Sequence, residues 1–229
     1  MYTYGTYSVQ SMTVMGRILV PTLIISDIAC ALPILIHSRK DEVKPIRKVS
    51  LSTVGSIIIV GLWVNIFIEF LLGFVPSSLI DNYNDMMKIL DGMNFPEQIL
   101  MTGILAPFIE ELVFRYGLIG LFRNYQPKKL KCSGITVGIV FSAVSFGIAH
   151  GNLVQGSYAF VLGLLLGYLY TRNNNLTESI ILHITINTSS LILSVLKTPF
   201  SQIMTVGMVV CFVINVFYVI IAIKEKRNL

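Results

Sequence analysis

Residues 107–115 read PFIEELVFR, and this stretch places two glutamates and an arginine inside a segment that is otherwise uncharged from Ile99 to Phe122. A charged group at the centre of a membrane helix costs roughly 2.5 to 3.5 kcal/mol on insertion scales, so three unpaired charges would cost about 8 kcal/mol. The whole free energy of unfolding of a typical protein is about 5 to 15 kcal/mol. If this segment lies in a membrane, its charges must therefore be paired, hydrated or neutralised.

The composition of the chain is that of a membrane protein. Of its 229 residues, 54% are hydrophobic and 13% are charged, and the mean hydropathy is +0.76. In ordinary soluble domains roughly a quarter of the residues are charged. Apolar segments recur at the length of about 20 residues that a helix needs to cross a bilayer. We therefore expect one domain over residues 1–229: an all-α polytopic bundle of about seven transmembrane helices in the cell membrane.

The positions of the predicted spans fix the expected topology. The spans lie at about 14–36, 51–75, 98–121, 134–150, 155–171, 178–196 and 201–223. The basic segments 39–48, 123–131 and 224–227 fall on one side of such a bundle, and the acidic segment 76–97 falls on the other. Cytoplasmic loops are enriched in Lys and Arg, so the C-terminus is expected in the cytoplasm and the N-terminus outside. These loops account for the net charge of +5, and because no nucleic-acid-binding motif is present we expect no nucleic-acid partner.

Two other features of the apolar segments bear on packing. Gly163 and Gly167 form a GxxxG pattern, which is typical of closely packed membrane helices. Asp27 and Glu69 are carboxylates inside apolar segments, and such residues are candidates for a function. Neither has a second motif residue beside it, so we expect a packing or pairing role for both.

Helical spacing separates the three charges of the opening stretch. Glu111 and Arg115 are four residues apart, so they can form an ion pair on one face of a helix. Glu110 lies about 100° around the helix from Glu111 and lacks that partner. All three charges could simply hold this helix against its neighbours. The alternative is that Glu110 is free for chemistry.

Two histidines in apolar segments strengthen the chemical interpretation. His150 follows Phe146 by four residues in SFGIAHG, and His183 precedes Asn187 by four residues in ILHITIN. Each pair therefore shares one helical face. A single histidine on an apolar face is more often a hydrogen-bonded core residue than a ligand. Two histidines and a spare carboxylate in a membrane domain are costly to bury and suited to acid–base work.

These side chains predict a hydrolytic site. Water activated by Glu110 and His150 could attack a carbonyl group, and His183 with Asn187 could donate hydrogen bonds to the oxyanion. The sequence contains no HExxH motif, no GxGD motif and no GxSx motif in a span, which sets aside the usual zinc, aspartyl and serine intramembrane proteases. Two histidines and one glutamate can also hold a catalytic zinc ion. The spacing does not decide between a metal site and a metal-free site.

Three motifs resemble those of a known family. EELVFR (Glu110, Glu111, Arg115), FGIAH (Phe146, His150) and HITIN (His183, Asn187) look like the EExxxR, FxxxH and HxxxN/D motifs of the CAAX protease and bacteriocin-processing enzyme family, called CPBP or Abi. The three motifs occur in the family's order over about residues 98–195, which would form the catalytic core.

The resemblance implies a role for each matched residue. Glu110 and His150 would activate the attacking water, and His183 and Asn187 would stabilise the oxyanion. Glu111, Arg115 and Phe146 would support the site. If a divalent metal such as zinc takes part, Glu110, His150 and His183 would hold it. The donor character of His183 and Asn187 favours a metal-free mechanism.

The family resemblance also implies a class of function. We expect an intramembrane endopeptidase acting on a membrane-associated or lipidated protein or on a bacteriocin-type peptide. An alternative is a nonenzymatic immunity or scaffold protein with the same fold. A third is a proton-coupled transporter, because ionisable residues in spans also mark transport paths, although no inverted repeat is evident in the sequence.

The depths of the two histidines set a condition on the site. In straight spans, His150 would lie about sixteen residues from the cytoplasmic side and His183 about six, a difference of roughly 15 Å. The two side chains can share a site only if the helices are tilted, shifted or broken around a cavity, which is where membrane proteins tolerate irregular backbone. We therefore predict a polar cavity that brings together Glu110, His150, His183 and Asn187.

Overall fold

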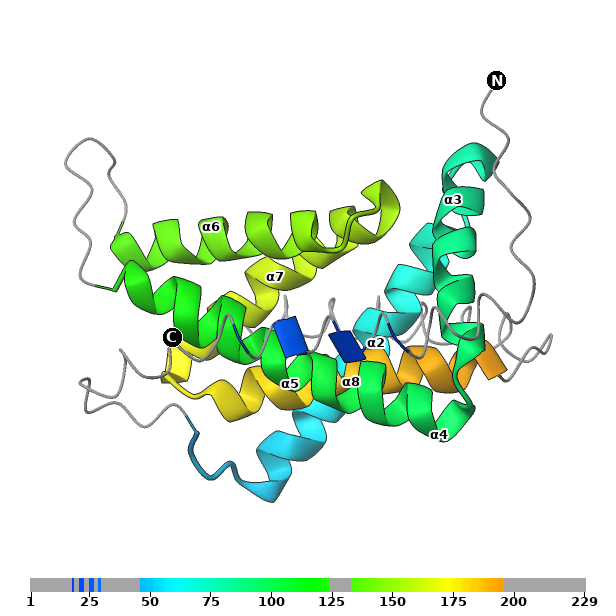
Figure 1. Ribbon diagram of the computed structural model, residues 1–229. Coiled ribbons are helices and arrows are strands. Elements are labelled where there is room, and N and C mark those ends of the chain that lie inside the picture. The colour runs from blue at the N-terminus through cyan, green and yellow to red at the C-terminus, as the bar shows by residue number, and fades with distance from the viewer. Residues whose placement is uncertain are drawn as a thin grey trace, which may run out of the picture.

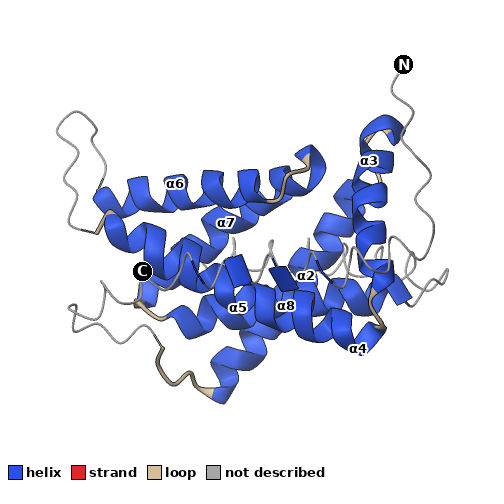
Figure 2. Cartoon of the chain, in the orientation of Figure 1, coloured by secondary structure: helices blue, strands red, loops and turns tan. Residues whose placement is uncertain are grey.

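The computed structural model describes residues 46–123 and 133–195, together with a few isolated positions between 18 and 29. The predicted span at 201–223, Asp27 and most of the span at 14–36 lie outside these residues. The described part of the chain is all-helical and contains no strand, as predicted (Figure 2).

Ten helical elements make up the described chain (Figure 1). They are α2 (Leu51–Leu72), α3 (Ser77–Met87), η1 (Lys88–Gly92), α4 (Phe95–Gln98), η2 (Ile99–Leu105), α5 (Ala106–Glu110), η3 (Glu111–Ile119), α6 (Gly134–Ala149), α7 (Leu153–Asn173) and α8 (Leu176–Val195). Element η1 is a 3₁₀-helix, and η2 and η3 are π-helices.

Polar capping residues explain where the long helices begin. The side chains of Ser50, Ser133 and Asn152 accept hydrogen bonds from backbone N–H groups in the first turns of α2, α6 and α7. These bonds satisfy donors that have no partner within a helix. At the other end of α7, Asn174 adopts a left-handed conformation with φ 51°, which asparagine tolerates better than most residues. The chain therefore reverses tightly into α8.

Small residues let α6 and α7 pack closely, and the prediction from the GxxxG pattern is confirmed. A Cβ atom added at Gly163 would lie 2.8 Å from the Cα of Ala143, and one at Gly167 would lie 3.1 Å from a side-chain carbon of Ile139. Farther along the same pair of helices, a Cβ atom at Gly147 would lie 2.8 Å from the carbonyl oxygen of Gly156. The two backbones therefore approach in a way that larger residues would prevent.

The predicted membrane spans are only partly regular helices. Within the described residues, α2, α7 and α8 are long and apolar enough to cross a membrane, and α6 is a shorter apolar helix. The segment predicted as a span at 98–121 is helical throughout, but it is a succession of the end of α4, η2, α5 and η3 and not one regular α-helix. Pro107, which has no N–H to donate, lies in the first turn of α5. The π-helical stretches flank α5, and the EExxxR motif begins at the last residue of α5 and continues into η3.

Candidate active site

The ion pair predicted within the opening stretch is present and fully buried. Arg115 Nε lies 3.3 Å from Glu111 Oε1, and both side chains are 0% exposed. The guanidinium group also donates to the hydroxyl of Ser142 at 3.4 Å, and its carbon lies 4.4 Å from the centre of the Phe146 ring. The Ser142 hydroxyl in turn donates to the carbonyl of Phe114 at 2.6 Å. A buried arginine therefore ties η3 to α6.

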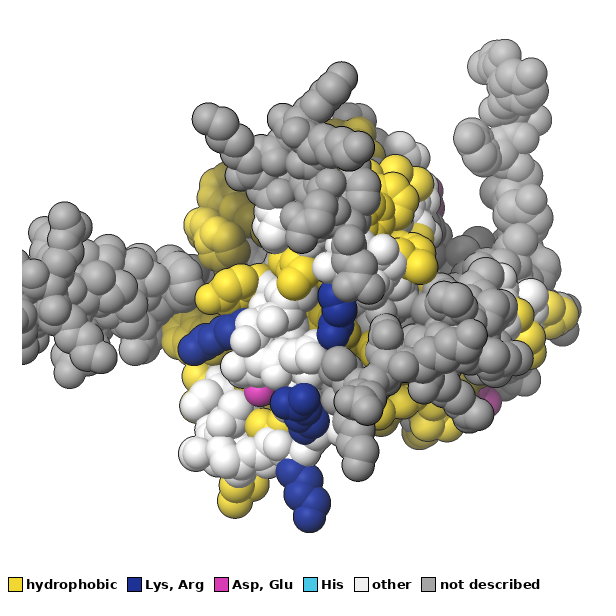
Figure 3. All heavy atoms as spheres, turned by 90° about the vertical axis from the view of Figure 1, so that its left-hand side faces the viewer, with side chains coloured by type: hydrophobic (Ala, Val, Ile, Leu, Met, Phe, Trp, Pro, Cys, Tyr) yellow, Lys and Arg dark blue, Asp and Glu magenta, His cyan; other side chains and the backbone are white. Residues whose placement is uncertain are grey.

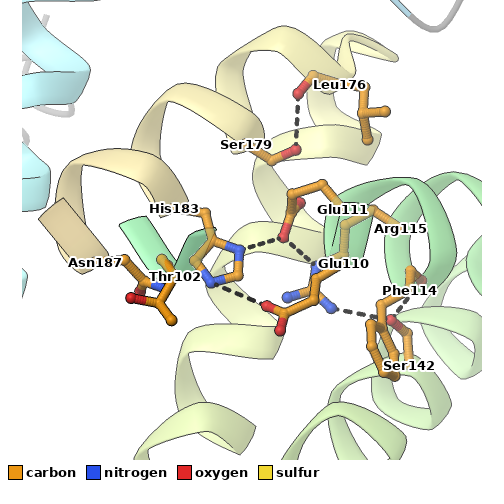
Figure 4. Close-up of polar contacts among 10 residues, drawn as sticks. All are labelled: Thr102, Glu110, Glu111, Phe114, Arg115, Ser142, Leu176, Ser179, His183 and Asn187. Atoms are coloured by element: carbon orange, nitrogen blue, oxygen red, sulfur yellow. Dashed lines mark hydrogen bonds and ion pairs between the residues drawn. The ribbon is translucent and has the colours of Figure 1, made fainter. Parts of the chain in front are cut away.

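His183 connects the two glutamates (Figure 4). Its Nδ1 lies 3.0 Å from Glu111 Oε1, and its Nε2 lies 3.5 Å from Glu110 Oε2. His183 is 3% exposed, whereas the Glu110 side chain is 20% exposed. The ion pair with Arg115 is made by Glu111, as expected from the spacing. Glu110 is thus the more accessible carboxylate of the site.

The sequence did not predict that Glu110 and Glu111 would approach the same side chain. An α-helix turns successive residues about 100° apart, but the π-helix η3 begins at Glu111, and π-turns are wider and often occur at functional sites. The two nitrogens of one imidazole lie on different edges of the ring and can therefore reach two successive carboxylates. Glu110 and Glu111 of the EExxxR motif therefore both contact His183, which lies on α8.

Phe146 lies between the two histidines. The centre of its ring lies 4.7 Å from that of His150 and 5.5 Å from that of His183, both in edge-to-face geometry. His150 also places Nδ1 2.8 Å from the carbonyl oxygen of Phe146. A carbonyl oxygen can only accept, so Nδ1 carries a proton and a neutral His150 has its lone pair on Nε2. The FxxxH motif thereby fixes the form in which His150 can act as a base.

A backbone carbonyl group of η2 holds the side chain of Asn187. Its Nδ2 donates to the carbonyl oxygen of Thr102 in η2 at 3.1 Å, and the amide group has a second N–H for another acceptor. The sequence interpretation missed Thr102 and Ser142. The signal was weak, because both are single hydroxyl residues in apolar segments, and in Thr102 the contributing group is the backbone carbonyl.

A cavity of about 70 Å³ connects these side chains. Three helices each contribute residues at i, i+3, i+4 and i+7, which is one helical face. The cavity is lined by Asn65, Ile68, Glu69 and Leu72 of α2, Tyr83 of α3, Phe146 of α6 and the following His150, Gln155, Tyr158, Ala159 and Leu162 of α7, and His183, Ile186, Asn187 and Ser190 of α8.

The cavity has the properties expected from the sequence. One water needs roughly 10 to 15 Å³ measured in this way and two to four polar partners, so the cavity has room and partners for several. It contains His150, His183 and Asn187. Glu110 is not one of the lining residues and joins the site through His183. The predicted cavity is therefore present for His150, His183 and Asn187, whereas Glu110 lies outside its lining.

An offset between helices resolves the difference in depth between the two histidines. Phe146, near the end of α6, contacts His183 in the first half of α8. Helices α6 and α8 run in the same direction in Figure 1 and are displaced along their axes. His150 follows one turn after Phe146. The condition that the helices be shifted around a cavity is met.

The residues proposed as metal ligands do not form a metal centre in this geometry. Within residues 46–123 and 133–195, no three His, Cys, Asp or Glu side chains come together in a way that could hold a metal ion. Both nitrogens of His183 face carboxylates, and the Phe146 ring lies beside both imidazoles. We therefore derive the chemistry below without a metal step.

Comparisons with known proteins agree with this site. Residues 93–189 match the family model described as type II CAAX prenyl endopeptidase Rce1-like. This part of the chain is similar to the Rce1-like family. The match includes every proposed catalytic residue, from Glu110 to Asn187, and accords with the CPBP resemblance of the three motifs. No solved structure matches the chain at a significant level.

Two bacterial proteins are similar to this chain. YdiL of Bacillus subtilis, whose name provisionally calls it a membrane peptidase, is 24% identical over 174 residues, covering 72% of this chain and 68% of YdiL. The UPF0177 protein YaiF of Lactococcus lactis is 30% identical over 113 residues, covering 49% of this chain and 47% of YaiF. Together with the apolar helices, these similarities support a multi-pass membrane protein that is related to CAAX-type proteases.

Proposed function

We propose that this protein is an intramembrane endopeptidase that hydrolyses a peptide bond with water activated by Glu110 and His150. The observation that carries the proposal is the cavity that joins His150, His183 and Asn187, with Glu110 in contact with His183. Its substrate would be a membrane-associated or lipidated protein or a bacteriocin-type peptide. The family match and the name of YdiL support the peptidase assignment.

Glu110 and His150 have the properties of the groups that move protons. Glu110 is not neutralised by Arg115 and is partly exposed, so its carboxylate can accept a proton from water. His150 presents Nε2 as an acceptor because Nδ1 donates to the Phe146 carbonyl. The hydroxide formed attacks the carbonyl carbon, and the proton passes to the leaving amine. The products are a carboxylate and a protonated amine, which carries both protons of the water, so atoms and charges balance.

His183 and Asn187 are the proposed donors to the oxyanion. Asn187 has one N–H on the Thr102 carbonyl and can direct the other into the cavity. His183 is oriented by Glu111, which faces its Nδ1, and its Nε2 lies beside Glu110. Because Nδ1 faces an acceptor, His183 donates from Nε2 in the form that carries a proton on both ring nitrogens. Donors that are fixed before the reaction stabilise the developing negative charge without reorganisation. Glu111 and Arg115 act indirectly, by holding His183 in place.

The test is hydrolysis of candidate peptides by the purified protein in detergent. Glu110→Gln keeps the shape of the side chain and removes the base, so we expect cleavage to fall by roughly 10²-fold or more. His150→Ala should have a similar effect. The matched control is Glu178→Gln, which removes a buried carboxylate that hydrogen-bonds Asn173 outside the cavity. Unchanged cleavage in Glu110→Gln would refute the assigned role.

The same cleavage assay also tests the metal dependence and the nonenzymatic alternative. A metal-free mechanism predicts that cleavage persists after treatment with a strong zinc chelator, and loss of cleavage that added zinc restores would overturn it. If the protein instead acts as a nonenzymatic immunity or scaffold protein, cells carrying Glu110→Gln would keep the protection or binding that the wild type gives. That result, with no cleavage by the wild type, would replace the peptidase proposal.

A further inference from the structure

One face of α2 brings a carboxylate to the cavity. Asn65, Ile68, Glu69 and Leu72 follow each other at helical spacing, and all of them line the cavity that contains His150 and His183. Neither Asn65 nor Glu69 belongs to a sequence motif, and a packing or pairing role was expected for Glu69. Within the described residues, no basic side chain forms an ion pair with Glu69. The expected pairing is therefore not found there.

Two tyrosines complete this part of the cavity. Tyr83 of α3 and Tyr158 of α7 have ring centres 6.5 Å apart in edge-to-face geometry. Both side chains line the cavity together with Glu69. Aromatic faces and carboxylates together attract cations. Helix α3 thus contributes a side chain to the cavity although it lies outside the predicted spans.

Asn65 adds a hydrogen-bond donor without a partner. It is 2% exposed, and its Nδ2 has no hydrogen-bond partner in the described part of the chain. A buried polar group left unsatisfied costs roughly 1 to 3 kcal/mol. A carboxylate in a membrane helix is also costly. The Asn65 amide therefore stays unsatisfied in the described protein, and the exposed Glu69 carboxylate one turn away has no ion-pair partner among the described residues, so a bound ligand could satisfy both.

We propose that Asn65, Glu69, Tyr83 and Tyr158 form a subsite that binds a lysine or arginine residue of the peptide substrate. Glu69 receives the ammonium or guanidinium group, with the two phenol rings beside it. Asn65 Nδ2 donates to a backbone carbonyl oxygen of the same peptide. This inference deepens the proposed function, because the subsite shares its cavity with His150, His183 and Asn187 and so selects the bond presented to them.

The substrate that fits is an extended segment carrying one positive charge. In the bilayer, a lone lysine or arginine costs several kcal/mol, and meeting Glu69 would offset the cost for both partners. A neutral residue of the same length would leave Glu69 unpaired. An acidic residue would face a like charge. Selectivity for a basic residue therefore follows from the charge that α2 places in the cavity.

The test compares two peptides of about 20 apolar residues, one with a central lysine and one with norleucine at that position. Binding is measured in detergent with protein carrying Glu110→Gln, so that binding is observed separately from hydrolysis. We expect the lysine peptide to bind about tenfold more tightly. Glu69→Gln should abolish this preference, and Glu69→Lys should transfer it to a peptide with a central aspartate. Asp85→Asn is the matched control, because it removes an exposed carboxylate of α3 outside the cavity.

Cleavage of the same peptides by protein with Glu110 intact separates the two proposals. A lysine preference in binding without any cleavage would support the subsite and contradict the peptidase. Cleavage without a lysine preference in either assay would overturn the subsite and leave the peptidase intact. Thermal unfolding is a further check, because Glu69→Gln removes an unpaired charge and should leave Tm unchanged or higher. A fall in Tm together with an unchanged lysine preference would assign Glu69 a structural role.

Discussion

The buried Glu111–Arg115 pair is the residue-scale feature on which the site depends. Both side chains are 0% exposed, so removing one partner leaves an uncompensated charge, which typically costs about 3 to 5 kcal/mol. We expect Arg115→Met to lower Tm by roughly 10 °C, since 1 kcal/mol corresponds to about 2 to 4 °C at this chain length. Thermal unfolding in detergent measures the shift.

The exposed pair of Lys88 and Asp85, 2.6 Å apart, is the control for this prediction. Solvent screens such a pair, so Lys88→Gln should leave Tm almost unchanged. The double variant Glu111→Gln, Arg115→Met should recover part of the loss, because the unpaired carboxylate is gone. Equal Tm values for Arg115→Met and the wild type would show that the buried pair contributes nothing to stability.

The sequence was most informative about individual residues. The four-residue spacing predicted the Glu111–Arg115 pair and the shared face of Phe146 and His150, because helical periodicity is a local property. Contacts between helices could not be derived in this way. That Glu110 and Glu111 both face His183 depends on the π-turns of η3 and on the position of α8.

At the scale of elements, the close packing of α6 on α7 positions α6, and the His150 that follows it, at the site. We expect Gly163→Ala to lower Tm, because its Cβ atom would lie 2.8 Å from the Cα of Ala143 and the helices would have to separate. Cleavage should fall as well, because moving α6 displaces Phe146 and His150 from His183. Both effects are measured on the same purified variant.

A glycine with free space around it provides the comparison for Gly163. Gly55 in α2 has no atom within 4 Å of an added Cβ, and alanine is favoured over glycine in a helix by about 1 kcal/mol. Gly55→Ala should therefore leave Tm unchanged or raise it. The packing argument fails if both substitutions change Tm by the same amount and in the same direction.

The broken segment 98–121 shows the limit of prediction for elements. Its length and apolar character indicated one span, and these properties do not distinguish an α-helix from a succession of α- and π-helical turns. Pro107 was a visible signal for a change in hydrogen bonding. The π-helical stretches η2 and η3 carry Thr102 and Glu111, so the irregular backbone lies where the site is built.

At the scale of the whole molecule, basic residues gather at one end of the bundle. Arg123 donates to Tyr170 and Asn174, the backbone of Arg47 donates to Asn175, and Arg172 lies in the last turn of α7. Figure 3 shows Lys and Arg side chains on this face of the molecule. The described chain thus brings the cations of separate segments together beside the turn between α7 and α8.

This gathering supports the proposed topology, in which that end faces the cytoplasm and α3 lies outside. The test uses single cysteines in a background without Cys30, Cys132 and Cys211. Ser52→Cys and Ser78→Cys place exposed thiols at the first turn of α2 and just beyond its last turn, without changing any charge.

A membrane-impermeant maleimide should label Ser78→Cys in intact cells and Ser52→Cys only after permeabilisation. The reverse pattern would invert the topology. The result also decides how substrates arrive, because Tyr83 of α3 and Glu69 near the end of α2 line the cavity on the side of Ser78. With this topology, a basic peptide would reach the proposed subsite from outside the cell before it meets His150 and His183.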